Sequence, residues 1–88
     1  MPYIQKGRRT ALAPVIESVP QSLTRGELNY LITSILLKSM AETSYTELEA
    51  AIGTLEMVKL EFYRRMAVPY ETAKKMTNGE VYPVKHEL

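Results

Sequence analysis

SYTELEAAIGTLEMVKLEFYRRMA, residues 44–67, is the longest uninterrupted helical pattern in the chain. At about 100° per residue, one side of this helix collects apolar side chains and is the expected core face. That face consists of Leu48, Ala51, Ile52, Leu55, Phe62 and Met66. Gly53, Met57 and Leu60 fall on nearly the opposite side, where a helix with one apolar neighbour would carry charge. The central helix therefore needs to be covered on two faces.

A second long helix is predicted to begin at Thr24. Thr24 and Glu27 have the spacing of a capping box, and Leu23 and Leu28 are placed as a hydrophobic staple around it. The expected core stripe of this helix is Leu28, Leu31, Ile32, Ile35, Leu36 and Ser39. Tyr30, Leu37 and Met40 form a second apolar group on its far side. This helix, too, has two apolar faces.

The connection between the two helices is predicted to be short. Residues 41–43 form a turn, and Ser44 with Glu47 forms a second capping box. A turn this short leaves neighbouring helices antiparallel. Residues 24–67 are therefore expected to form a long antiparallel helical hairpin.

The two ends of the chain contain prolines that interrupt the helical pattern. Before the hairpin we predict a helical turn up to about Ala11, then a new or kinked helix with Pro14 in its first turn and Pro20 at its end. After the hairpin, Val68-Pro69 is expected to end or redirect the helix, with a short helix over residues 70–76. Asn78-Gly79 is a strong turn signal.

The expected fold is a small all-α helical bundle in one domain, residues 1–88. It is built on the long antiparallel helical hairpin, with the kinked amino-terminal helix packed across it and a core over about residues 5–76. The last residues, 77–88, are expected to form an extended carboxy-terminal arm, which packs over the bundle, packs onto a neighbour or is disordered.

Composition narrows the classes of function. Eleven basic and ten acidic residues give a net charge of +1, which does not favour nucleic acid or an anionic membrane as partner. The chain has no cysteine and one histidine, so no Cys/His zinc site and no cofactor are expected. No apolar run is long enough for a signal peptide or a membrane span, so we expect a cytoplasmic protein.

Several motifs resemble a family of short, uncharacterised proteins of phage and prokaryotic genomes. They are Gly26-Glu27-Leu28-Asn29-Tyr30, Ile32-Thr33, Gly53, Leu55-Glu56, Lys59, Glu61, Tyr63-Arg64-Arg65, Pro69-Tyr70-Glu71, Asn78-Gly79 and Val81-Tyr82, with the opening Met1-Pro2-Tyr3-Ile4. The resemblance implies a prokaryotic or viral, cytoplasmic setting and supplies no catalytic residue. Thr72 and Ala73 stand where family members carry an acidic residue and a lysine.

Lys59 is the most unusual candidate for chemistry, because it falls inside the expected core stripe. Its charge either reaches solvent along its aliphatic stem or pairs in a polar pocket with Glu56 and the hydroxyl of Tyr63. Asn29 joins these three as a candidate binding residue. We assign no catalytic residue and no metal ligand from the sequence.

Two groups of charged side chains suggest other functions. Glu49, Glu56 and Glu61 invite comparison with helical hydrolases that hold magnesium, but only two of them could converge on one ion. Arg64-Arg65 and Lys74-Lys75 could meet a phosphate backbone, but the central helix lacks the exposed polar face of a recognition helix. A metal- or nucleotide-dependent hydrolase using Glu56 and Lys59, and a nucleic-acid or polymerase-associated phage factor, remain the alternatives.

The second apolar faces favour a non-enzymatic interaction module that self-associates, most simply as a homodimer. The expected interface is Tyr30, Leu37, Met40, Gly53, Met57 and Leu60. The competing explanation is that Val81, Tyr82 and Val84 of the arm fold back over the same patch within one chain.

Overall fold

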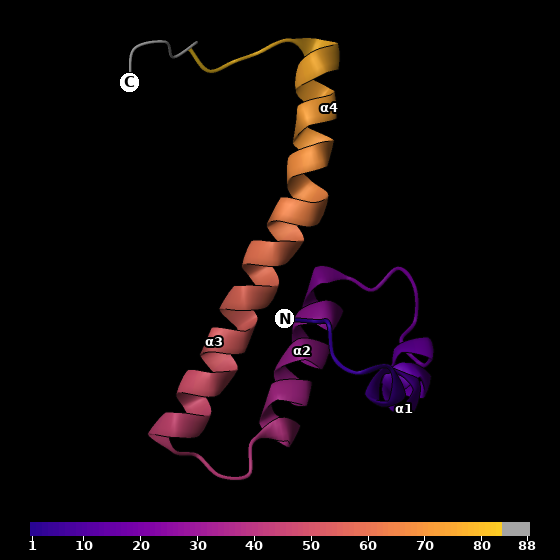
Figure 1. Cartoon of the computed structure of the whole chain (residues 1–88), viewed down its shortest axis with the longest axis vertical. Helices are drawn as coiled ribbons and strands as arrows, with labels where there is room; N and C mark the ends of the chain where they lie inside the picture. Colours follow the sequence, from indigo (N-terminus) through magenta and orange to yellow (C-terminus); the bar gives the residue numbers. More distant parts are fainter. Residues whose placement is uncertain (84–88) are drawn as a thin grey trace. The chain divides into compact units, whose positions relative to one another are not determined.

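The computed structural model describes residues 1–83, and within them the chain forms helices and no strands (Figure 1). The expected all-α class is confirmed. The elements are α1 (Lys6–Glu17), α2 (Arg25–Ser39), α3 (Tyr45–Phe62), a π-helical turn η1 (Tyr63–Ala67) and α4 (Val68–Asn78). The chain divides into two compact units, Met1–Leu55 and Glu56–Leu88.

Helix α1 differs from the expectation, because it runs through Pro14 as one helix. Pro14 has no N–H to donate to the carbonyl of Thr10, so a break near Ala11 was expected. Thr10 is exposed, and water can satisfy its carbonyl. The helix ends before Pro20, as predicted.

The amino terminus of α2 has the capping box that its sequence predicts. The Glu27 amide donates to Thr24 Oγ1 over 3.1 Å, and the Thr24 amide donates to the Glu27 carboxylate over 2.8 Å. Both groups would otherwise lack a partner at a helix start. Thr24 therefore sets where α2 begins.

Helix α3 begins after the short turn, where the sequence places it. The Glu47 amide donates to Ser44 Oγ over 3.2 Å. The predicted antiparallel packing of α2 on α3 stays a prediction.

The sequence predicts that the helix ends or is redirected at Val68-Pro69; in the structure the helical run continues past the proline, and the expected helix over residues 70–76 lies within α4. Val68 is α-helical, with φ −63° and ψ −49°, and Pro69 lies in the first turn of α4. A proline ring clashes with the carbonyl four residues earlier, here that of Arg65. The π turn η1 lies directly before it, and its Val68 amide donates to the carbonyl of Tyr63, five residues back. The helical run therefore passes the proline through one wide turn.

The expected core is not enclosed. None of the described residues is buried, in either unit. In the core stripes only Leu31, Leu36 and Ala51 are half-buried, and the rest are exposed. A side chain is buried only where another element packs against the helix face that carries it.

Candidate interaction surface

The second apolar face of α3 is open to solvent. Met57 and Leu60 are 53% and 50% exposed, and Gly53 is also exposed. A methyl group added at Gly53 would meet nothing within 4 Å. Glycine costs a helix about 1 kcal/mol relative to alanine, and nothing in the described part of the chain requires the absence of a side chain there.

The apolar group on α2 is only partly open. Tyr30 and Leu37 are exposed, whereas Met40, which caps the end of α2, is half-buried. Tyr30 also borders a shallow hollow formed with Arg25, Gly26, Asn29 and Thr33. Five of the six expected interface residues are thus available for contact, with Met40 the exception.

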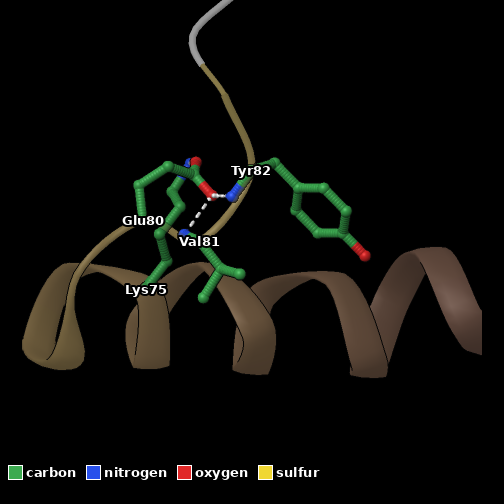
Figure 2. Close-up of polar contacts among 4 residues, drawn as sticks. All are labelled: Lys75, Glu80, Val81 and Tyr82. Carbon is green, nitrogen blue, oxygen red and sulfur yellow. Dashed lines mark hydrogen bonds and ion pairs between the residues drawn. The ribbon is translucent and has the colours of Figure 1, made fainter.

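The carboxy-terminal arm turns at Gly79, whose φ of 98° favours glycine over any other residue. After the turn, the Glu80 carboxylate accepts hydrogen bonds from the amides of Val81 and Tyr82 and pairs with Lys75 Nζ at 3.6 Å (Figure 2). The Tyr82 hydrogen bond, followed by the Val81 hydrogen bond and the Lys75 charge, holds the pKa of Glu80 below its ordinary value, although desolvation opposes the shift.

This clasp places the arm beside α4 rather than over Met57 and Leu60. Val81 and Tyr82 are 88% and 80% exposed, so they bury little of themselves. Val84, the third residue of the proposed covering segment, lies outside the described residues. The described part of the arm therefore leaves the second face of α3 uncovered.

Between the arm and α4 lies an open cavity of about 610 Å³. Its helical side includes Tyr63, Val68, Thr72 and Lys75, and its other side includes Tyr82. Acidic and basic groups both line it, and no single ligand chemistry follows from that mixture.

Of the candidate binding residues, Glu56, Lys59 and Tyr63 lie in the second unit and Asn29 lies in the first. Lys59 Nζ pairs with Glu56 at 3.3 Å, and the two side chains are 70% and 54% exposed. The lysine thus reaches both of its predicted destinations, Glu56 and solvent. Tyr63 is exposed in η1, and Asn29 accepts a hydrogen bond from the Thr33 hydroxyl within α2, in the other unit.

Among the acidic and basic side chains considered for other functions, Glu61 pairs with Arg64 at 3.7 Å and with Arg65 at 3.9 Å along the same helical run. Across residues 1–83, no three acidic or histidine side chains gather as a metal-binding group. In the same part of the chain, no helix combines the length and apolar character that crossing a membrane requires.

Sequence reasoning missed two features of this region, the Glu80 clasp and the π turn. The clasp has a recognisable signal, since Lys75 and Glu80 carry opposite charges on either side of the Asn78-Gly79 turn. The π turn has a weaker one, a proline that follows an unbroken helical pattern.

These features define a small all-α chain whose apolar helix faces are open. A family model, Domain of unknown function (DUF6899), matches residues 1–81, and the chain belongs to this family. No curated protein and no solved structure matches it.

Proposed function

We propose that the protein is a non-enzymatic helical interaction module that self-associates, in its simplest form as a dimer. The observation that carries the proposal is that no described residue is buried, although both long helices bear apolar side chains on two faces. Folded domains gain their stability by removing such side chains from water. A second copy supplies the missing surface, and a two-fold axis lets one patch cover its own copy.

Leu60 carries the test, because it is a large apolar residue on the open second face of α3 and is 50% exposed. Leu60→Glu places a charge where the partner would remove water, which is costly without a counter-charge. We expect sedimentation equilibrium to show a wild-type oligomer and a monomeric variant that keeps most of its helical circular dichroism. Glu17→Leu, an exposed change on α1 that swaps the same two residue types, serves as the control and should stay oligomeric.

A wild-type protein that sediments as a monomer at tens of micromolar would contradict the proposal. In that case the apolar faces would have to be covered within one chain, either by the two units packing on each other or by the arm.

The setting we propose is a prokaryotic or viral cytoplasm, supported by the motifs at residues 26–30 and 69–71 that resemble phage and prokaryotic proteins. Thermal shift measurements with magnesium, nucleotides and DNA separate the module from the hydrolase and from the nucleic-acid factor. A ligand that binds only the native state raises the melting temperature. No shift with any of the three is the result expected of the module.

A further inference from the structure

We infer that Asn78, the last residue of α4, is a site of covalent modification, at which the side-chain amide is converted to a carboxylate through attack by the backbone nitrogen of Gly79. The last turn of α4 and the Glu80 clasp set the rate of this conversion. All of these residues belong to the unit Glu56–Leu88, and the inference does not depend on self-association.

The reaction at Asn78 needs only water and a base. A hydroxide ion or a buffer base takes the proton of the Gly79 amide, and the nitrogen then bonds to the side-chain carbonyl carbon of Asn78. The bond from that carbon to the side-chain nitrogen breaks, and ammonia leaves with a proton returned by the base. Water opens the resulting succinimide at either of its two carbonyl carbons, so ammonia is exchanged for water and residue 78 becomes aspartate or isoaspartate.

The surroundings of Gly79 leave the attacking nitrogen unhindered. Gly79 has no side chain, and a Cβ added there would meet nothing within 4 Å. Asn78 is exposed, so water and base reach its side chain. The φ of 98° at Gly79 favours glycine at this position, which keeps the least hindered residue next to Asn78.

The last turn of α4 slows the reaction in the folded chain. The Gly79 amide donates to the carbonyl of Lys75 over 2.8 Å, and a hydrogen-bonded amide gives up its proton less readily. Closing the succinimide also requires rotation about the Cα–C bond of Asn78, away from the helical ψ of about −42°. The reaction therefore proceeds through local opening of this turn.

The Glu80 clasp holds the same turn closed. Lys75 is engaged twice, by its carbonyl with the Gly79 amide and by its Nζ with the Glu80 carboxylate at 3.6 Å (Figure 2). The two side chains of the ion pair are 52% and 44% exposed, so its effect on the opening equilibrium is modest.

Asn29, the other asparagine of the chain, provides an internal comparison. It lies inside α2, its side chain accepts a hydrogen bond from the Thr33 hydroxyl, and the residue after it is the bulky Tyr30. Asn29 should therefore convert far more slowly than Asn78.

Incubation of the whole chain at pH 8, native and in guanidinium chloride, tests the site and its control. Peptide mapping by mass spectrometry locates each conversion. We expect Asn78 to convert in both samples, about tenfold more slowly in the native one, with Asn29 unchanged in the native sample. Conversion of Asn78 no faster than that of Asn29 would overturn the site, and equal rates in the two samples would overturn control by the last turn.

Lys75→Met tests the clasp, because it removes the ammonium without changing the residues that react. The native variant should convert about two- to fivefold faster than the wild type, and the two should be equal in guanidinium chloride. Lys74→Met makes the same change of charge at a lysine that lies over the Tyr70 ring, and it is the control that should keep the wild-type rate. Equal rates for the two native variants would show that the clasp does not set the rate.

The conversion should release the arm, because it adds a negative charge at the carboxy-terminal end of α4, where the helix dipole is also negative. Asn78→Asp reproduces one product, and hydrogen exchange at the Gly79 amide should be about two- to fivefold faster in it than in the wild type. Asn78→Gln stays neutral and should exchange as the wild type does. Wild-type exchange in Asn78→Asp would overturn the release.

Discussion

Thr24 shows how one side chain can fix the start of a helix. Its hydroxyl accepts from the Glu27 amide, and the Glu27 carboxylate accepts from the Thr24 amide. Both bonds are local in sequence, which is why the boundary was predictable without knowledge of the rest of the fold.

We expect Thr24→Ala to lower the free energy of unfolding by about 1 kcal/mol, because the Glu27 amide loses its acceptor. Denaturant unfolding at fixed protein concentration, with an unchanged slope, gives the measurement. Thr46→Ala, one residue inside α3, is a control that removes a hydroxyl for which the structure shows no capping bond. A Thr24 variant as stable as the wild type would mean that the capping box contributes nothing.

The contacts of the Glu80 carboxylate cannot be predicted from amino-acid composition. Its carboxylate gathers two amides and one ammonium across a turn, although the side chain itself stays in water. Because the pKa of Glu80 is lowered, the clasp is complete at neutral pH and is lost as the pH falls through that lowered pKa.

At the scale of helices, the boundaries that were predicted correctly rest on short-range chemistry. Ser44 caps α3 and Gly79 ends α4, and each does so through atoms within a few residues. Pro14 and Pro69 were misjudged, because whether a helix continues past a proline depends on the strength of the helical pattern on both sides. The rule that proline lacks one hydrogen-bond donor concerns a single residue and does not take the flanking helical pattern into account.

Pro69→Ala tests why η1 is a π turn. Alanine restores an N–H that can donate to the Arg65 carbonyl, so the run should relax to an α-helix over this turn. The Val68 amide then no longer bonds to the Tyr63 carbonyl, and we expect total helicity to be kept. Backbone chemical shifts report the turn, and circular dichroism reports total helicity.

Pro83→Ala changes a proline outside the helices and should alter neither property. If the π turn persists in Pro69→Ala, the proline is not its cause.

For the whole molecule, the all-α class was predictable, whereas the location of the core was not. Helical periodicity identifies which side chains share a face, as with Leu48 and Ile52, but it does not say what lies opposite that face. Both residues are exposed within the described chain. The same holds for the candidate binding residues, since the Glu56–Lys59 ion pair follows from helical spacing, whereas the exposure of both side chains does not.

Gly53→Ala should have opposite effects in the monomer and in the assembly. In the Leu60→Glu background, alanine should raise the free energy of unfolding by roughly 1 kcal/mol through helix propensity alone. In the wild-type background, the added methyl group should meet the partner that we propose for this face of α3 and weaken dimerisation. Equal stabilisation in both backgrounds would show that no partner approaches Gly53.

The absence of buried side chains among residues 1–83 has a consequence for how long the protein survives after synthesis. A chain that completes its fold by pairing, as we propose for this one, would spend its early lifetime with open helix faces, and open states are what proteases degrade. Slow synthesis leaves each chain alone for longer, so more of it is destroyed before a partner arrives. The amount of intact protein should therefore rise more steeply than the rate at which it is made.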